Sequence, residues 1–406
     1  MSTNILKVNN NISTDESITR YELHSYAPFT SISLNTADNI VISINQESAY
    51  ILPSESVIYV DGKIVRDDGS EITKGTTVEL INNALPFLFN EVRLEINGVE
   101  IDSCKNVGIA STMKAYVSFS PNEIKKYEMT GWNKKLLCDD YSFSGYIPLK
   151  FILGFAETYR KIILNQKLDL ILIRSNNTKD PIQCTGTSKD FKIQLNRVIW
   201  KCPHVSVGDD LRLHLLTQYR KNVPINMTFR KWSLSYYPSI PLSREGSWSL
   251  RTASNIEKPR YIILGFQTAR DNDVSKDPSC FDSQTLTDIR VYLNSEAYPY
   301  EQLSIDFNKK QYLPLYLMYC NFQESYYSKD LSEPLLGYEE YLTKAPLCVI
   351  DTSKQSEVWK SGVSVDILVA WKFNSNPAAN TALYALIISD SFCKLYPLTN
   401  SVQKIL

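Results

Sequence analysis

Hydrophobic and polar positions alternate in one stretch of the chain, and the same pattern returns about half a chain later. Residues 91–98 read Glu-Val-Arg-Leu-Glu-Ile-Asn-Gly, and residues 288–295 read Asp-Ile-Arg-Val-Tyr-Leu-Asn-Ser. Apolar residues at every second position are typical of a strand with one buried face. Asn followed by Gly or Ser favours the positive φ of a hairpin turn. The two runs begin at residues 91 and 288, which are 197 residues apart.

Two further pairs of segments support a repeat. The apolar runs 169–174 and 366–371 each open with Asp, and their first residues, 169 and 366, are again 197 residues apart. A third pair, Pro148-Leu149 and Pro346-Leu347, is one residue out of this register. Three pairs at nearly one offset predict an internal duplication of a β-rich unit that takes up almost half of the chain.

Many other short runs of apolar and β-branched residues lie between polar turns, as strands do. In the first half the pattern predicts strands at 40–44, 56–65 with a hairpin at Asp61-Gly62, 76–81, 91–101 with a hairpin at Asn97-Gly98, 146–149, 167–174 and 191–200. In the second half it predicts strands at 211–215, 228–237, 260–266, 288–295, 363–373 and 381–389. Helical turns are expected only at 120–129 and 154–163. We therefore expect an all-β chain of two sandwiches or jelly rolls.

The pattern also divides the chain into regions. We expect a flexible N-terminal arm at 1–20, a first unit at 21–203, a second unit at 204–400 and a tail at 401–406. Two long segments with few strand signals, about 102–145 and about 300–345, are expected to be insertions with tasks of their own. The junction at 202–210 is short, which favours two units that abut tightly.

Composition narrows the class of function. The net charge is −1, so a strong overall attraction to nucleic acid is not expected. The eight cysteines are spread along the chain without a Cys-x-x-Cys pair, as buried or incidental thiols would be. No apolar run has the length of a membrane span, and the first residues lack a signal core. We expect an intracellular, soluble and reduced protein without a membrane span.

The sequence contains few groups suited to catalysis or metal binding. It has no phosphate-binding loop of the Gly-x-Gly-x-x-Gly or Walker type and no Gly-x-Ser-x-Gly elbow. Only three histidines occur, and Cys202, His204 and His214 are interpreted as packing residues, with His214 in the middle of a strand. Asp169 and Asp366 are interpreted as flanking core strands. We therefore predict no catalytic residue, no cofactor and no metal site.

Aromatic residues offer the best candidate for a contact surface. The chain has 25 tyrosines, and the predicted insertion at 300–345 holds a dense group of them. Aromatic side chains on a surface segment favour contact with another chain, although local packing within the insertion is the alternative. The candidate inter-subunit contact residues are Tyr312, Tyr316, Tyr319, Tyr326 and Tyr327. Trp232, Trp248 and Trp371 could form a sugar-binding platform, but core or interface anchors are the favoured interpretation.

Several runs together resemble one known family. The segment 258–268, Lys-Pro-Arg-Tyr-Ile-Ile-Leu-Gly-Phe-Gln-Thr, and the segment 289–299, which contains Leu-Asn and ends in Tyr-Pro, are similar to runs of the double jelly-roll major capsid proteins. The segments 147–155, 169–175 and 229–234 fit the same group. This is the lineage of tailless phages and adenovirus-like viruses, and the likeness is greatest to the Polinton/adintovirus type, which includes endogenised copies.

The resemblance implies a fold and a function. It implies two tandem eight-stranded jelly rolls with loop insertions that contain short helices, and a homotrimer with a pseudo-hexagonal outline. Such trimers contact one another in an icosahedral shell around viral double-stranded DNA, which they enclose without sequence-specific binding, and a penton protein is a further partner. The implied location is the virion capsid, after synthesis in the host cytoplasm and assembly in the nucleus or cytoplasm. The alternatives are a lectin-like carbohydrate-binding module and a two-jelly-roll hydrolase.

Overall fold

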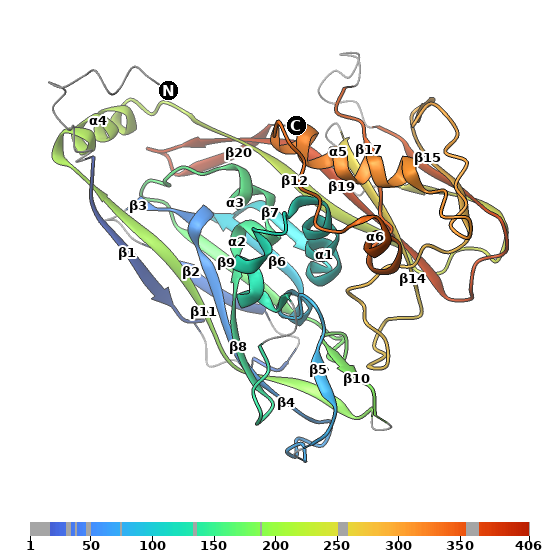
Figure 1. The fold of residues 1–406 in the computed structure, drawn as a ribbon. Coiled ribbons are helices and arrows are strands. Elements are labelled where there is room, and N and C mark those ends of the chain that lie inside the picture. The colour runs from blue at the N-terminus through green and yellow to red at the C-terminus, as the bar shows by residue number, and fades with distance from the viewer. Residues whose placement is uncertain are drawn as a thin grey trace, which may run out of the picture.

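The computed structural model describes residues 17–29, 34–36, 39–45, 50–73, 75–132, 136–186, 189–250, 259–354 and 365–405. The two halves of the chain each form an antiparallel barrel of two facing sheets (Figure 1). One hydrophobic core runs through both barrels.

The first barrel contains eight main strands. One sheet has the order β1 (Ile18–Tyr26), β11 (Phe191–Val207), β4 (Val57–Arg66) and β8 (Ser142–Pro148). The facing sheet has the order β2 (Asn39–Ile44), β9 (Leu168–Arg174), β6 (Phe89–Ile96) and β7 (Val99–Lys105). Strand β3 (Tyr50–Ile51) pairs with β11, and β5 (Val78–Leu80) with β10 (Ile182–Cys184).

The second barrel repeats this arrangement. One sheet has the order β12 (Ile225–Tyr237), β19 (Thr381–Tyr396), β14 (Pro259–Thr268) and β17 (Cys348–Asp351). The other has the order β13 (Glu245–Leu250), β18 (Ile367–Phe373), β15 (Leu286–Leu293) and β16 (Glu296–Tyr298). When the main strands are numbered along each half, both barrels have the orders 1-8-3-6 and 2-7-4-5. This is the jelly-roll topology, and the predicted fold class is confirmed.

The repeated run occupies the same place in both barrels. Strands β6 and β15 are each the fourth strand, with the seventh strand on one side and the fifth on the other. Arg93 and Arg290 both point away from the core, with side-chain exposures of 31% and 22%. The aliphatic residues between them and the turn face inward, as their alternation predicts.

The turn after each repeated strand shows that the duplication extends to side-chain chemistry. Asn97 has a φ of 52°, its N–H donates to the Lys167 carbonyl, and its Oδ1 accepts from the Lys167 N–H. Asn294 has a φ of 55° and makes the same two bonds to Asp366. Lys167 is therefore the structural counterpart of Asp366. The proposed pairing of Asp169 with Asp366 is two residues out of register, and Asp169 corresponds to Leu368.

The helices lie mainly in the connections. They are η1 (Pro53–Glu55), η2 (Leu85–Leu88), α1 (Val107–Ser118), η3 (Ile124–Thr130), α2 (Leu149–Ile152), α3 (Gly154–Thr158), α4 (Asp209–Arg220), α5 (Leu313–Tyr327) and α6 (Tyr338–Lys344). The predicted helical turns at 120–129 and 154–163 correspond to η3 and α3. Before η3, Ser120 and Glu123 each accept a bond from the other's backbone N–H, which is a capping box.

Several predicted boundaries are wrong. Residues 18–20 belong to β1, and residues 401–405 form a further strand, β20 (Ser401–Ile405), beside β19; residues 1–16 of the proposed arm lie outside the described residues. Strand β11 runs past residue 203 to Val207. The predicted strand 211–215 is part of helix α4.

The predicted hairpin at Asp61-Gly62 is also wrong, because β4 passes through these residues without turning. A Cβ on Gly62 would lie 2.7 Å from the Gln194 carbonyl oxygen and 2.8 Å from the Phe143 ring. Gly62 is therefore required by the close approach of β11 and an aromatic ring rather than by a turn.

Candidate functional site

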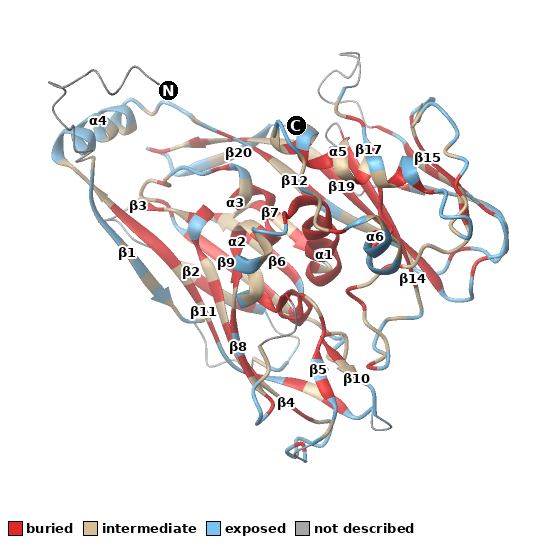
Figure 2. Ribbon diagram, in the orientation of Figure 1, coloured by how far each residue is buried: buried red, intermediate tan, exposed pale blue. Residues whose placement is uncertain are grey.

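The long connections after β7 and β16 meet between the two barrels. Helix α1 follows β7 directly, and all twelve of its residues are buried (Figure 2). Helix α5 from the second barrel packs against it. The Tyr319 hydroxyl donates to the Tyr116 carbonyl at 3.0 Å, and the Gln323 amide donates to the Phe119 carbonyl at 3.1 Å. The segments expected to be insertions with a task of their own thus join the two halves of the chain.

A buried ion pair stands at the centre of this contact. Lys114 on α1, 4% exposed, places its Nζ 3.0 Å from Glu157 Oε1 on α3. The same Nζ donates to Ser118 Oγ at 2.8 Å. From the second barrel, the hydroxyls of Tyr326 and Tyr327 donate to the two oxygens of Glu157 at 2.7 and 2.6 Å. One carboxylate therefore holds groups from α1 and α5 together.

Aromatic rings surround the ammonium group of Lys114. Its Nζ lies 4.7 Å from the ring centre of Trp232 and 4.3 Å from that of Tyr326, within the range of cation–π attraction. Burial lowers the pKa of Lys114, and the charge of Glu157 opposes this effect. Burial and the charge of Glu157 raise the pKa of Tyr326 and Tyr327 well above the usual value, so both remain donors.

Strand β12 approaches the first barrel so closely that one position there admits only glycine. A Cβ on Gly154 of α3 would lie 1.8 Å from the Arg230 carbonyl oxygen. The Trp232 indole N–H donates to the Ile152 carbonyl at 3.1 Å, and the Arg230 guanidinium donates to the Tyr326 carbonyl at 2.6 Å. These bonds place β12 and α5 at a fixed position on α2 and α3.

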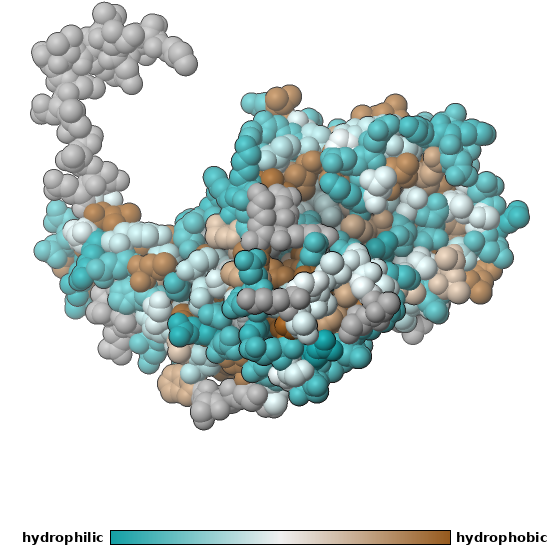
Figure 3. Space-filling view, turned by 60° about the horizontal axis from the view of Figure 1, so that its bottom comes forward, coloured by the Kyte–Doolittle hydropathy of each residue, from teal (hydrophilic) through white to brown (hydrophobic). Residues whose placement is uncertain are grey.

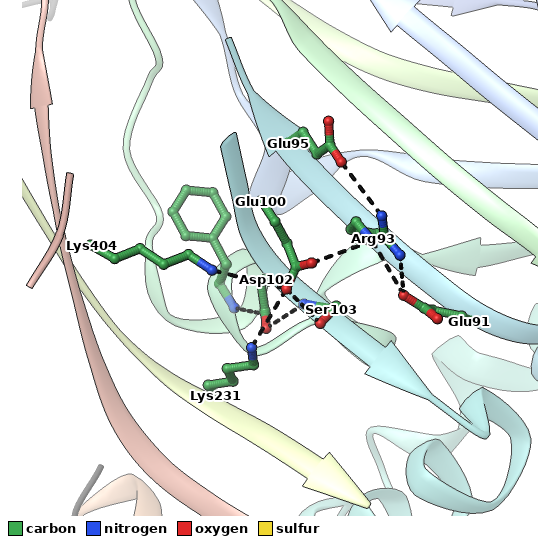
Figure 4. A network of polar contacts seen from close by, with 9 residues as sticks. Glu91, Arg93, Glu95, Glu100, Asp102, Ser103, Lys231 and Lys404 are labelled. Carbon is green, nitrogen blue, oxygen red and sulfur yellow. Dashed lines mark hydrogen bonds and ion pairs between the residues drawn. The ribbon is translucent and has the colours of Figure 1, made fainter. Parts of the chain in front are cut away.

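A second polar network crosses the boundary beside β7 (Figure 4). Arg93 on β6 lies 2.7 Å from Glu91 and 3.4 Å from Glu100. Glu100 in turn faces Lys231 of β12 at 3.8 Å and Lys404 of β20 at 4.0 Å. The repeated arginine of the first barrel thus belongs to a charge network that reaches two strands of the second barrel.

Asp102 is the most deeply buried member of this network, at 1% exposure. Its Oδ2 accepts from the Phe155 N–H at 2.9 Å, and its Oδ1 accepts from the Ser103 N–H at 2.9 Å. Burial raises the pKa of Asp102 to about 6, although the charge of nearby Lys231 and the two backbone N–H groups favour the ionised form. The carboxyl fixes α3 against β7, next to the strands of the second barrel.

The structure places the five candidate tyrosines in this region, mostly inside the chain. Tyr312, Tyr319 and Tyr326 are buried, at 0, 1 and 6% exposure, and their rings and hydroxyls contact residues of the same chain. In the single chain, Tyr312 bonds within the insertion, whereas Tyr319 and Tyr326 bond to residues of the first barrel. Tyr316 and Tyr327 are half-buried, and their contact with another subunit stays a prediction.

The structure also places the cysteine, histidine and tryptophan residues that the sequence analysis considered. Cys202 and His204 are buried on β11, whereas His214 lies exposed on helix α4, not in a strand. Trp232 and Trp371 are buried and so do not form an open platform. Across the described ranges, no three His, Cys, Asp or Glu side chains are grouped as metal ligands. In the same ranges, no helix combines the length and the apolarity that a bilayer span requires.

One cleft at the boundary contains carboxyl groups from both barrels. It has a volume of about 250 Å³, and Asp180 and Asp271 contribute to its lining. Burial raises the pKa of Asp180 to about 6. Its Oδ1 accepts the backbone N–H of Asn272 at 2.6 Å. Asp180 therefore links the first barrel to a turn of the second.

Two eight-stranded jelly rolls in one chain are the architecture of double jelly-roll proteins. A family model described as a double jelly roll-like domain matches residues 78–393, which is well over half of the chain. The chain belongs to this family. No curated protein sequence gives a significant match.

Solved structures of viral capsid proteins share the fold along their whole length. The structure of PBCV-1 Vp54 fitted into a reconstruction of the virophage Sputnik matches with a TM-score of 0.59 and 13% identity, over 98% of this chain and 99% of that one. The Sputnik virophage structure gives a TM-score of 0.62 and 11% identity, over 100% and 92%. The mavirus major capsid protein gives 0.57 and 10%, over 100% and 93%. At such identities the likeness concerns the fold.

Proposed function

We propose that this chain is the major capsid subunit of a DNA virus or of a virus-derived element, and that it assembles as a homotrimer. The observation that carries the proposal is the repetition of one barrel within one chain, with the two barrels locked together by α1, α3 and α5. Three such chains supply six similar barrels, which gives a trimer an almost hexagonal outline. Hexagonal units tile a sheet with contacts that repeat between copies, and a penton protein at the vertices lets the sheet close into a shell.

The comparisons support this proposal through the proteins whose fold is shared. The mavirus match is named as a major capsid protein, and another match is the structure of the Sputnik virophage. The chain covers nearly the whole of each of these proteins, so the shared fold includes both barrels. We also propose that the chain comes from the Polinton/adintovirus group, because residues 258–268 and 289–299 resemble runs of these proteins.

The remaining parts of the proposal concern the assembled particle. The trimers form an icosahedral shell with a penton protein at its vertices and enclose double-stranded DNA. A net charge of −1 fits a shell whose copies pack densely without mutual repulsion and which holds DNA without reading its sequence. The protein is located in the virion capsid after assembly in the host nucleus or cytoplasm.

We assign the chain no enzymatic role. The two carboxyl groups that share a cleft, Asp180 and Asp271, lie where the barrels meet, and Asp180 is bonded to the backbone of the opposite barrel. A structural link between barrels accounts for this arrangement.

Sedimentation velocity of the purified chain tests the proposed function. We expect a species with three times the mass of the chain, together with larger particles as protein concentration rises. A monomer that persists at micromolar concentration under every salt condition would contradict the proposal.

A further inference from the structure

Helix α4 (Asp209–Arg220) lies on the outside of the molecule, between the last strand of the first barrel and the first strand of the second. None of its twelve residues is buried, and Figure 2 shows the helix in the colours of exposed and intermediate residues. Its ends are nevertheless fixed: the Gly208 N–H donates to the Ser17 carbonyl at 3.0 Å, and Asn222 Oδ1 accepts the Leu398 N–H at 3.1 Å. The helix is therefore held in place at both ends while it presents its side chains outward.

A helix of this length gains little stability by itself, because short isolated helices are marginal in water. Three of its leucines are exposed, with Leu213 at 64%, Leu211 at 37% and Leu216 at 37%. The face shown in Figure 3 is mainly hydrophilic with separate small hydrophobic patches. Leu213 and Leu216 thus present a small apolar surface at a fixed position on the molecule.

Four residues of α4 form one stripe along its outer side. Asp209, Leu213, Leu216 and Arg220 are spaced by four, three and four residues, so they lie on the same face of the helix. The stripe begins with a negative charge, has two leucines at its centre and ends with a positive charge. All four residues are exposed.

This stripe is complementary to itself. Positions 209 and 220, and positions 213 and 216, are placed symmetrically about the point between residues 214 and 215. A two-fold axis through that point brings a second copy of α4 antiparallel to the first. It sets Leu213 against Leu216 of the second copy and Asp209 against Arg220 of the second copy, at both ends of the contact. We infer that α4 is a two-fold contact between two copies of this chain.

The symmetry indicates which copies meet. A contact in which the same patch meets itself is isologous, whereas a ring of three subunits is closed by heterologous contacts. The α4 contact therefore joins chains of two neighbouring trimers rather than chains within one trimer. This step rests on the proposed function. A pair of twelve-residue helices covers far less than the area of about 1,000 Å² that a stable interface needs. The contact is therefore weak for a single pair of chains and stabilises a shell because many copies of it form at once.

Charge reversal distinguishes a contact between two copies of α4 from a change in the stability of the helix itself. Asp209→Arg and Arg220→Asp each place like charges together at both ends of the pair, and each should lower the yield of assemblies larger than the trimer by about tenfold or more. The double variant Asp209→Arg/Arg220→Asp restores opposite charges across the axis and should restore the yield. Each reversal is unfavourable for the helix dipole, so a purely structural effect would make the double variant the worst.

Cysteine cross-linking tests the register. Chains with Leu213→Cys mixed with chains with Leu216→Cys should form a disulfide between the two variants under mild oxidation, as mapped by peptide mass spectrometry. Leu242→Cys, at another exposed leucine, is the matched control and should not cross-link to either variant.

The outcomes separate this inference from the proposed function. Trimers and particles that form equally well with all the charge variants would overturn the α4 contact and leave the capsid function standing. The same conclusion follows if the double variant assembles no better than the single ones, or if Leu213→Cys links to Leu216→Cys no more than to Leu242→Cys. A wild-type chain that never associates would overturn both.

Discussion

Lys114 is a central residue of the junction between the two barrels. Its ammonium group is buried among aromatic rings from the second barrel and paired with Glu157. Lys114→Met would leave the Glu157 carboxylate, whose side chain is 15% exposed, with only hydroxyl partners, so we expect the free energy of unfolding to fall by about 3 kcal/mol. Urea denaturation would measure this change.

Two further variants show whether that loss comes from the unpaired charge of Glu157. Lys114→Met/Glu157→Gln removes both charges and should recover a large part of the loss, because no buried charge is left unpaired. Lys344→Met removes an exposed partner of Glu340 and should cost less than about 1 kcal/mol. Equal losses for Lys114→Met and Lys344→Met would contradict a central role for the buried pair.

A substitution at Gly154 tests how closely the two barrels approach each other at this position. A Cβ there would overlap the Arg230 carbonyl oxygen, which belongs to a strand that cannot move freely. We expect Gly154→Ala to lower the free energy of unfolding by about 1–3 kcal/mol or more. Gly337→Ala is the matched control, since a Cβ at Gly337 has no atom within 4 Å, and its effect should stay within about 1 kcal/mol. Thermal unfolding of the two variants side by side would decide between them.

Asp102 gives the junction a predictable pH dependence. Burial raises the pKa of its carboxyl to about 6 in the folded chain, against a usual value of 3.8. Between these values the folded state binds more protons than the unfolded state, so this group's contribution to stability falls as pH rises from about 4 to 7. At 1.36 kcal/mol for each unit of pKa, the decrease is about 3 kcal/mol at most.

The comparison with Asp102→Asn isolates this effect, because the amide does not titrate. The difference in free energy of unfolding between the wild type and the variant should shift against the wild type as pH rises through this window. A difference that is flat from pH 4 to 7, or that shifts in favour of the wild type, would contradict the assignment.

At the scale of elements, the repeated turn should contribute to stability in both barrels. Asn97→Ala and Asn294→Ala each remove the acceptor for the N–H of the residue just before the seventh strand, Lys167 or Asp366, and place Ala at a positive φ. We expect each to cost about 1–2 kcal/mol, as measured by chemical denaturation. Asn308→Ala, at an exposed loop position, should be nearly neutral. A large loss for only one of the two turns would mean that the repeat is one of shape alone.

Elements with a clear period could be predicted from the sequence, and elements without one could not. The alternation in 91–98 and 288–295 gave the correct strands and their equivalence. Helix α1 was missed because all of its residues are buried, so no polar face reveals a period of 3.6. Helix α4 was misread because Leu211, Leu213 and Leu215 alternate as in a strand. In the helix all three leucines are at least partly exposed. A hydrophobic pattern does not predict this, because it assumes that leucines are buried.

The junction could not be predicted from sequence because its partners are distant in the chain. Lys114 and Glu157 are separated by 43 positions, and the tyrosines that complete the site are in the other barrel. Tyr319 and Tyr326 of the tyrosine cluster contact the first barrel of the same chain, and no pattern within the cluster reveals these partners. Contact of the cluster with another subunit stays a prediction.

At the scale of the whole molecule, one chain carries the same barrel twice and fixes the two copies side by side. The central claim is that three such chains form a unit with six barrels and a hexagonal outline. Electron microscopy of the purified chain tests this most directly. We predict two-dimensional class averages of a hexagonal particle with three-fold symmetry, alone or within closed shells. Averages that show only single chains with two barrels, at every protein and salt concentration, would contradict the account.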